Sequence, residues 1–358
     1  MTTTMNMKLK LAIAGAGLLS FSALNADTFV YGNTAGGNWD NTAADGWATF
    51  PGGVTGGLPT STDSAIIHIN KTVVVNSAIT FGGALKVGNS NNATHSAALS
   101  VQAGSINTGS LTTAYNVTST GAVDISGGTL TNDGALVIGT NGSLNVSGGA
   151  YVDGRTGSRS VFDGGALGQN GVINISGGSF TSNGAVAGDL LTLEDSTVNV
   201  SGGTLDLQGG QLVGSSSNTA TINVIGAIGN AILVDRLNTS SNRTINFGFE
   251  FDGVGVGTVV STGSYINFSS INIAIDGTDY LGGTDSFLLF ESGNIVGDTE
   301  ALSESIVGFD AGSYATAIRY DFTTDDVYLD VTAIPEPGTY ALLAGMTGLV
   351  FVMVRRRS

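Results

Sequence analysis

Residues 123–128 read Val-Asp-Ile-Ser-Gly-Gly, and close variants of this phrase return at residues 144–149, 173–178 and 198–203. Each copy places Asn or Asp between two apolar residues and ends in Ser-Gly-Gly. The serines of successive copies lie 21, 29 and 25 residues apart. Because internal repeats of this kind are the signature of stacked architectures, they decide the interpretation of the whole chain.

A repeat of about two dozen residues is too short for a pair of helices and too long for a hairpin, but it suits one coil of a β-solenoid. Each copy begins as a strand in which Leu144 and Val146 point to one side and Asn145 to the other. Ser-Gly-Gly then turns the chain, because glycine reaches positive φ angles without steric cost. We therefore predict an all-β protein in which residues 64–235 form a parallel β-helix.

Stacking is what makes such a coil stable. One coil cannot bury its apolar side alone, whereas neighbouring coils bury it against one another. With an inter-strand spacing of roughly 4.8 Å, about seven coils give a rod on the order of 35 Å long. A second strand in each coil is indicated by the phrase Gly-Ala-Leu-Lys-Val-Gly at residues 83–88, which has echoes at residues 134–139 and 209–214.

The composition agrees with this fold. Glycine accounts for 55 of the 358 residues, proline for four, and charged residues for 11%. These values are typical of an all-β repeat protein rather than of an α/β enzyme. A hydrophobic content of 41% supplies enough apolar surface to exclude a disordered chain. The lack of cysteine excludes disulfides, thiolate metal sites and cysteine nucleophiles.

Acidic residues dominate the charge balance. The 28 Asp and Glu face 12 Lys and Arg, for a net charge of −16. Five of the basic residues, Lys8, Lys10 and Arg355–Arg357, lie in the two terminal segments interpreted below as export and anchoring signals, and without these five the charge is −21. Such a surface repels nucleic acid, so we expect no nucleic-acid partner; its simplest role is solubility outside the cell.

Residues 1–26 have the three-part layout of a secretory signal peptide. Lys8 and Lys10 precede an apolar run from Leu11 to Phe21, and small residues follow toward Ala26. We expect cleavage after Ala26. The alternative is a permanent anchor, but the run is short for crossing roughly 30 Å of hydrocarbon.

Residues 27–63 read as an N-terminal cap. Trp39 and Trp47, the two tryptophans of the chain, stand here among turn residues. The end coil of a solenoid must be covered to stay soluble, and aromatic side chains cover a large area each. Sugar stacking on either tryptophan is the functional alternative.

The opening Trp39-Asp40, the turn from Pro59 to Asp63 and the Ser-Gly-Gly coils resemble the passenger-type β-helix regions of autotransporter-like surface proteins. The resemblance covers roughly residues 30–235. It implies an extracellular β-helix, but the outer-membrane barrel of that family does not follow in this sequence, so self-translocation is not supported.

Residues 236–332 continue with strands of alternating character after the repeats dissolve. Period-two alternation between Gly, Asp and Ser turns is an antiparallel signature. Strands are expected at residues 244–247, 271–276, 287–290, 318–322 and 327–331. We interpret this region as a β-rich C-terminal cap or small sandwich.

Residues 333–358 have three parts in a fixed order. Pro335-Glu336-Pro337 precedes an apolar run that ends at Val354, and Arg355, Arg356 and Arg357 follow. From Gly338 the run is 17 residues long, the lower bound for a membrane helix. We therefore expect a single C-terminal transmembrane helix, with the arginines as a cytoplasmic stop signal and the preceding protein on the outer side of the membrane.

This tail resembles the PEP-CTERM sorting signal, with Pro335, Glu336 and Pro337 as the motif. The resemblance covers about 25 residues. It implies that an exosortase of the inner membrane recognises and removes the tail, in a bacterium of Gram-negative type that makes extracellular polysaccharide. The protein would then move to the cell surface or the extracellular matrix.

Signs of catalysis are sparse along the body of the chain. His68 and His95 cannot form a three-histidine metal site, and no phosphate loop or nucleophile elbow is present. Polysaccharide lyases and glycosidases do use β-helix rods, with carboxylates and basic residues clustered on one face. A compact mixed-charge cluster of this kind stands near the repeats, formed by Asp153, Arg155, Arg159 and Asp163.

Calcium is a second chemical possibility. Asp276, Asp279 and Asp285, together with the pair Asp325-Asp326, supply hard oxygen ligands in predicted turns. They match neither the EF-hand loop nor the calcium-binding nonapeptide repeat, and aspartates that cap turns are the favoured explanation.

Three functions from different classes follow. The favoured one is an exported, non-catalytic protein without a cofactor or resident metal, structural or adhesive at the cell surface or in an exopolysaccharide matrix. Its expected partners are the exosortase, the inner membrane before processing, and extracellular polysaccharide. The alternatives are a secreted polysaccharide lyase or hydrolase on the same scaffold, and a calcium-dependent glycan-binding module.

Overall fold

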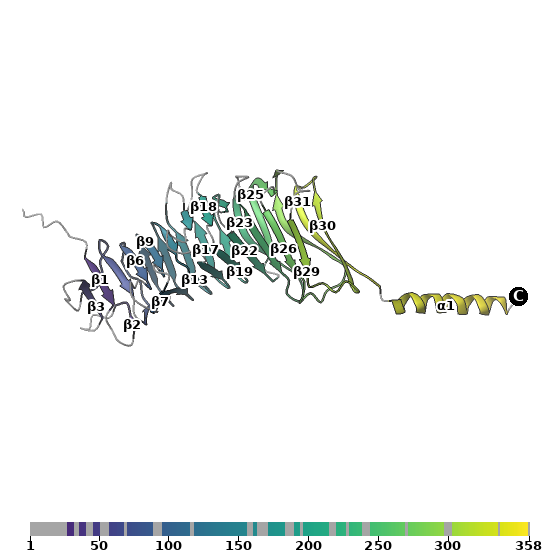
Figure 1. Ribbon diagram of the computed structural model, residues 1–358, viewed down its shortest axis with the longest axis horizontal. Helices are drawn as coiled ribbons and strands as arrows, with labels where there is room; N and C mark the ends of the chain where they lie inside the picture. Colours follow the sequence, from purple (N-terminus) through teal and green to yellow (C-terminus); the bar gives the residue numbers. More distant parts are fainter. Residues whose placement is uncertain are drawn as a thin grey trace, which may run out of the picture.

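The protein is an elongated rod of stacked β-coils with one helix beyond its C-terminal end (Figure 1). The computed structural model describes residues 27–31, 36–40, 46–50, 57–67, 70–88, 95–114, 118–155, 160–162, 171–182, 190–193, 196–214, 220–226, 229–237, 244–268, 271–296, 303–335 and 337–356. The predicted signal peptide, His68, Arg159, Asp163, Glu336 and Arg357 lie outside these residues.

One face of the rod is an eleven-stranded sheet in which every pair of neighbouring strands is parallel. At roughly 4.8 Å per strand, this sheet is about 48 Å long. In order its strands are β2 (Gly37–Asn38), β5 (Lys71–Val75), β7 (Ser96–Val101), β10 (Thr120–Ile125), β13 (Gly142–Val146), β16 (Val172–Ile175), β19 (Thr197–Val200), β22 (Ala220–Ile225), β24 (Ile245–Glu250), β26 (Ile271–Asp276) and β29 (Ser303–Val307).

A fourteen-stranded sheet forms a second face. Its parallel part contains β8 (Ser105–Thr108), β11 (Thr129–Asn132), β14 (Ala150–Asp153), β17 (Ser179–Ser182), β20 (Thr204–Asp206), β23 (Asn230–Leu237), β25 (Thr258–Asn267) and β27 (Asp285–Ser292), with β15 (Ser160–Phe162), β18 (Leu190–Leu193), β21 (Gln211–Val213) and β28 (Ile295–Val296) beside them. The antiparallel hairpin of β30 (Tyr314–Asp321) and β31 (Asp326–Ala333) extends it.

A six-stranded sheet completes the N-terminal part of the rod. Its strands are β12 (Leu136–Ile138), β9 (Ser110–Thr113), β6 (Ala84–Val87), β4 (Ser64–Ile67), β1 (Thr28–Tyr31) and β3 (Trp47–Phe50). The chain therefore visits three faces in turn, as in the order β7, β8, β9. The phrase at residues 83–88 contains β6, so the expected further strand per coil is confirmed, although most coils here have three strands rather than two.

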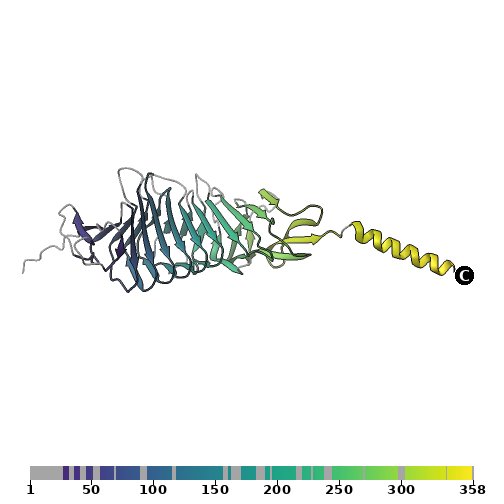
Figure 2. The same ribbon diagram turned by 90° about the horizontal axis from the view of Figure 1, so that it is seen from below.

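The repeated phrases stack in register, as the sequence predicts. Val123 lies opposite Leu144, Leu144 opposite Ile173, and Ile173 opposite Val198. These side chains are all buried and form one layer of a continuous core. The prediction of a parallel β-helix is confirmed, and Figure 2 shows the coils piled along the long axis of the rod.

The Ser-Gly-Gly turns work differently from the expectation of positive φ angles. The glycines with positive φ stand elsewhere, as at Gly88 and Gly104, and not in the four repeated phrases. At Gly177 a Cβ atom would lie 2.3 Å from the backbone oxygen of Ser147 on the preceding coil. The repeated glycines are therefore needed because successive coils approach too closely at the corner for any side chain.

The N-terminal end is closed by aromatic side chains. Trp39 and Trp47 are fully buried, with ring centroids 4.7 Å apart, and the indole nitrogen of Trp47 donates to the backbone oxygen of Trp39 over 2.8 Å. Antiparallel pairing of β1 with β3 closes the same end. This arrangement agrees with a cap, and the burial of both rings contradicts the alternative of sugar stacking.

The parallel stack continues past residue 235. Strands β24 and β26 pair in parallel with their neighbours, so the antiparallel prediction is wrong for residues 245–250 and 271–276. That prediction is correct for the last part of the region, where β31 pairs in an antiparallel manner with β27 and with β30. Alternation alone misled here, because a coil with one face in solvent alternates like an antiparallel strand.

The C-terminal helix α1 (Pro337–Arg355) extends away from the rod (Figures 1 and 2). None of the helices in the described residues is both long enough and apolar enough to cross a membrane, so the expected transmembrane helix is not confirmed.

Candidate functional site

A ladder of amide side chains runs along the outer face of the eleven-stranded sheet. The Nδ2 of Asn145 donates to a carboxylate oxygen of Asp124 over 2.7 Å, and Asn174 donates to the Oδ1 of Asn145 over the same distance. Asn199 and Asn223 continue the series with distances of 2.8 and 2.7 Å. The outward Asn of each repeat therefore holds its neighbour in one orientation along the rod.

The ladder stops at Asn223, because the next position in register is Gly248. Ala274 and Ser305 occupy the same row in the two following strands. No donor from the described part of the chain reaches the Oδ1 of Asn223. That oxygen is directed over Gly248, where a Cβ atom would lie 2.5 Å from it.

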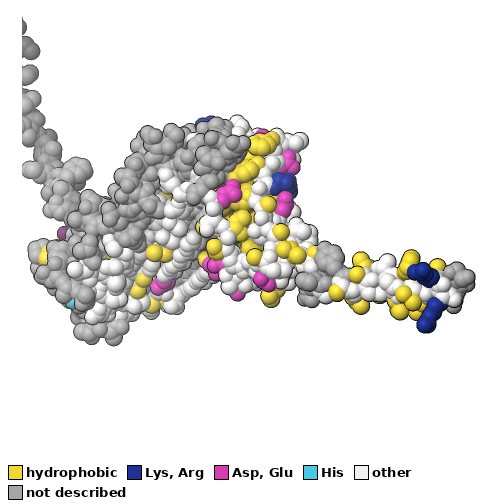
Figure 3. Space-filling model, turned by 45° about the vertical axis from the view of Figure 1, so that its right-hand side comes forward, with side chains coloured by type: hydrophobic (Ala, Val, Ile, Leu, Met, Phe, Trp, Pro, Cys, Tyr) yellow, Lys and Arg dark blue, Asp and Glu magenta, His cyan; other side chains and the backbone are white. Residues whose placement is uncertain are grey.

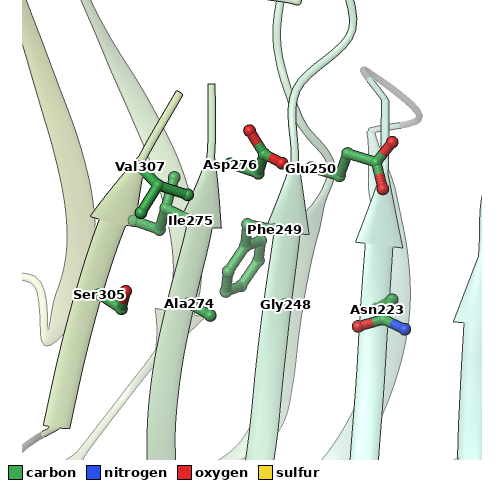
Figure 4. A pocket seen from close by; sticks show the side chains of 9 residues that line it. All are labelled: Asn223, Gly248, Phe249, Glu250, Ala274, Ile275, Asp276, Ser305 and Val307. Carbon is green, nitrogen blue, oxygen red and sulfur yellow. The ribbon is translucent and has the colours of Figure 1, made fainter. Parts of the chain in front are cut away.

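These small residues leave a hollow of about 170 Å³ on the sheet surface (Figure 4). Gly248 and Ala274 lie along its floor, and Asn223 and Ser305 lie at its two ends. Val307, which is 55% exposed, adds an apolar patch beside Ser305. The hollow is therefore shallow and open along the sheet, with polar groups at both ends.

One side of the hollow is acidic. Glu250 and Asp276 are neighbours in register, two residues beyond Gly248 and Ala274 in their strands. On the other side, the Nδ2 of Asn272 donates to the Oδ1 of Asn246 over 2.7 Å. The hollow thus lies between a pair of carboxylates and a pair of amides.

The two carboxylates differ in their surroundings. The Oδ1 of Asp276 accepts hydrogen bonds from the hydroxyl and the backbone N–H of Thr278, over 2.5 and 2.9 Å, and these hold the pKa of Asp276 below its usual value. The carboxylate of Glu250 accepts no hydrogen bond from the described residues. Glu250 and the Oδ1 of Asn223 are therefore two acceptors at the edge of one hollow that receive no hydrogen bond from the residues the structure describes.

The mixed-charge cluster predicted from the sequence is a buried ion pair where the structure describes it. Asp153 is 1% exposed, and its two oxygens accept hydrogen bonds from the Nε and an Nη of Arg155, each over 3.1 Å. Next to the pair, burial raises the pKa of Tyr151, and its hydroxyl accepts a hydrogen bond from Asn132 over 3.1 Å. This geometry is that of a structural pair inside the coil corner.

Three of the aspartates considered as calcium ligands form hydrogen bonds within local turns or with neighbouring strands. Asp276 binds its own turn through Thr278, and Asp285 accepts the backbone N–H of Ser286 over 2.8 Å. Asp326 accepts hydrogen bonds from Ser292 and Tyr328. Among the described residues, no three His, Asp or Glu side chains come together as a metal site.

The predicted sorting segment lies at the junction between the rod and α1. Pro335 follows β31 after one residue, and Pro337 is the first residue of the helix. The described side chains of α1 are exposed, with Leu342 and Phe351 at 67% each, and Arg355 and Arg356 stand at its far end. Figure 3 shows apolar side chains along the helix and basic ones at its end.

The hollow and its lining residues were not predicted from the sequence. The signal was present: residues 245–249 and 271–275 keep the apolar alternation of the repeats, but Gly248 and Ala274 replace the outward Asn. Reading these segments as antiparallel strands hid this substitution, because only parallel stacking brings the two small residues side by side.

Comparisons with protein-family models, with curated proteins and with solved structures each found no match.

Proposed function

We propose that the protein is exported and non-catalytic, and that it serves as a structural or adhesive rod at the cell surface or in an extracellular polysaccharide matrix. Its C-terminal tail directs it there: the segment around Pro335, Glu336 and Pro337 resembles a PEP-CTERM motif, and an exosortase of the inner membrane removes it. The observation that carries this proposal is helix α1, whose apolar side chains are exposed beyond the end of the rod.

The exposed apolar side chains of α1 need to be shielded from water. Exposed apolar patches of more than a few hundred Å² are rare on soluble proteins and mark sites of contact with membranes or other proteins. At 1.5 Å per residue, the 19 residues of α1 are about 28 Å long, so its length approaches the thickness of the hydrocarbon layer, although among the described residues α1 does not meet the length and hydropathy of a membrane-spanning helix. Arg355 and Arg356 at its end suit the cytoplasmic side of a membrane. Before processing, the tail would hold the rod on the outer side.

The burial of Asp153, the strongest catalytic candidate among the described residues, supports a non-catalytic role. A general acid or base must reach the substrate, whereas Asp153 is buried and bound by Arg155 at both oxygens. The long faces of the rod instead present amide and hydroxyl groups at regular spacing, which suits contact with an extended polymer.

A second candidate function is contact with a neutral polysaccharide at the hollow. The Oδ1 of Asn223 and the carboxylate of Glu250 accept hydrogen bonds, and sugar hydroxyls are the matching donors. The floor at Gly248 and Ala274 leaves room for a ring, and the net negative charge disfavours acidic polymers. The hollow is open along the sheet, so a chain could continue past it in both directions.

The sorting proposal is tested by two variants of the tail in the native host. Deletion of residues 335–357 should release the protein from the envelope fraction. The double variant Pro335→Ala/Pro337→Ala keeps the helix and should leave unprocessed protein in the inner membrane, where intact mass measurement detects the uncut tail. Gly283→Ala, in an open turn of the rod, serves as the control. The same fractionation for all four proteins would contradict the proposal.

The polysaccharide proposal is tested by filling the hollow. Gly248→Asn places an amide where the ladder would continue, and the oxygen that meets the new Cβ belongs to the end of the Asn223 side chain rather than to the backbone. Electrophoresis in native gels that contain dextran, mannan or hydroxyethylcellulose should show retardation of the wild type that falls at least tenfold in this variant. Ala122→Asn, on the same face but far from the hollow, is the matched control.

A change of charge at Glu250 distinguishes a neutral-glycan site from a site for acidic polymers or calcium. Glu250→Gln keeps the shape and an acceptor oxygen but removes the charge, so binding of a neutral glycan should weaken by about fivefold, the size of the roughly 1 kcal/mol between a charged and a neutral acceptor. Retardation only by alginate, or only after addition of calcium, would contradict a neutral glycan site. No retardation in any gel would remove the candidate while leaving the sorting proposal intact.

A further inference from the structure

The carboxylate of Asp63 holds the first described residue of the chain. Its Oδ1 accepts the backbone N–H of Asp27 over 3.0 Å, and its Oδ2 accepts the backbone N–H and the hydroxyl of Thr60 over 2.7 and 2.6 Å. The backbone oxygen of Asp27 in turn accepts the N–H of Ser64 over 2.8 Å. Both polar backbone groups of Asp27 are thus fixed at the point where β1 begins.

Asp63 is only 7% exposed, yet no Lys, Arg or His of the described residues contacts it. Burial raises the pKa of its carboxyl. The hydrogen bonds from Thr60 and Asp27 lower this pKa, and together they outweigh burial, so the pKa lies below the usual value. The side chain is therefore an anion at neutral pH. Buried anions are ordinarily paired with a cation, and this one lacks such a partner in the described chain.

We propose that Asp63 is the built acceptor for the α-amino group that export processing creates at Asp27. This inference rests on the export part of the proposed function, in which the signal peptide is cut after Ala26. Hydrolysis of the bond between Ala26 and Asp27 consumes one water, leaves a carboxylate on Ala26, and turns the amide nitrogen of Asp27 into an ammonium group. The nitrogen that already lies 3.0 Å from Asp63 then becomes the missing cation.

The gain comes from a change in the kind of hydrogen bond. A free α-amino group has a pKa of about 7.7 to 8.0, so it is protonated at neutral pH. The present bond already has a charged acceptor, and the ammonium group adds a charged donor, so the bond becomes an ion pair with an added Coulomb attraction. Because β1 pairs with both β3 and β4, the new ion pair fastens the strand that closes the N-terminal end of the rod.

The test compares two purified chains that both end at Ser358 and are kept in the same mild detergent. One begins at Asp27 and the other at Leu24. At pH 6.5 the chain that begins at Asp27 should unfold about 1.5 °C higher, the size expected for a gain of roughly 1 kcal/mol at an unfolding entropy of about 2.1 cal/mol/K per residue. The pair raises the folded pKa of the amino group, so this advantage is complete below its unfolded pKa and disappears as the pH rises above about 9.

Asp63→Asn in both chains supplies the control, because the amide removes the anion and keeps an oxygen toward Asp27. The difference in melting temperature between the chains that begin at Asp27 and at Leu24 should then vanish. Equal melting temperatures of the wild-type chains, or a difference that persists in Asp63→Asn, would overturn the inference. If Asp63→Asn does not fold, N-terminal acetylation of the chain that begins at Asp27 gives the same answer. These measurements use defined chains, so a failure of export in cells is detected separately by intact mass.

Discussion

Asn174 donates its side-chain N–H to the side-chain oxygen of Asn145, across 29 residues of sequence and 2.7 Å of space. Asn199 donates to Asn174 in the same way from the next coil. The outward Asn of the repeated phrase is therefore a structural residue of the rod face. Its place between two buried apolar residues turns it outward, where its amide donates a hydrogen bond to the Asn of the preceding coil and accepts one from the Asn of the next.

Asn174→Ala should lower the free energy of unfolding by about 1 to 2 kcal/mol, since it removes both ladder hydrogen bonds of a half-buried side chain. Urea unfolding followed by far-ultraviolet circular dichroism measures this change. Thr221→Ala, on the same face of β22, removes a side chain of similar exposure outside the ladder and should cost no more than about 0.5 kcal/mol. Equal losses in the two variants would show that the ladder adds nothing to stability.

Gly177→Ala should destabilise the rod although it adds only one methyl group. The new Cβ would lie 2.3 Å from the backbone oxygen of Ser147, so the two coils must move apart. Forced overpacking of this kind costs typically about 1 to 3 kcal/mol. Gly283→Ala is the matched control, because no atom lies within 4 Å of its Cβ position, and its melting temperature should stay near that of the wild type. A neutral Gly177→Ala would refute the close-contact explanation.

The parallel stacking of the coils could be predicted from the sequence. The number of coils in the stack and the third strand of many coils could not. Leu144 and Ile173 lie opposite each other because their phrases match, and that match is visible in the letters. The coils after residue 235 keep the same alternation without Ser-Gly-Gly, so the sequence did not distinguish them from antiparallel strands. The difference lies in which strand each one pairs with, and pairing is a tertiary property.

The candidate sites depended still more on tertiary structure. Asp153 and Arg155 stand two residues apart, so their proximity was predictable, but their burial was not. The hollow was beyond prediction because Gly248 and Ala274 come together only through the pairing of β24 with β26. The tail is the opposite case, since its order of proline, apolar run and arginine is readable in the sequence, and its role as a sorting signal stays a prediction.

Asp153→Ala should lower the free energy of unfolding. It leaves the guanidinium of Arg155 buried without its partner, and removing one member of a buried pair costs about 3 to 5 kcal/mol. The double variant Asp153→Ala/Arg155→Ala should recover part of this loss, because no unpaired charge remains. Thermal unfolding of the wild type, Asp153→Ala, Arg155→Ala and the double variant measures the coupling. Wild-type turnover of a polysaccharide, abolished in Asp153→Ala with the fold intact, would instead establish the enzyme that we do not favour.

Acidification should loosen the terminal hairpin of β30 and β31 before the rest of the rod. The Nε of Arg319 donates to Asp330 over 2.8 Å, and this bond, with a second from Ser286, keeps the pKa of Asp330 below its usual value. A depressed folded pKa adds stability above the unfolded pKa, near 3.9, and that stability is lost as the pH falls through the folded value. The pair is partly exposed, so we expect an effect well below that of the buried Asp153 pair.

The change is measurable in the near-ultraviolet dichroism of the tyrosines, since Arg319 lies 4.3 Å above the ring of Tyr328. Wild-type protein should lose this signal at progressively lower temperature between pH 5 and pH 2.5. Asp330→Asn should start from a lower melting point of the hairpin at pH 6 and depend less on pH. Thr332→Ala, at an exposed position of the same strand β31, is the control and should follow the wild type. A hairpin transition that ignores pH in the wild type, or one that shifts equally in Asp330→Asn, would show that this ion pair does not hold the end of the rod.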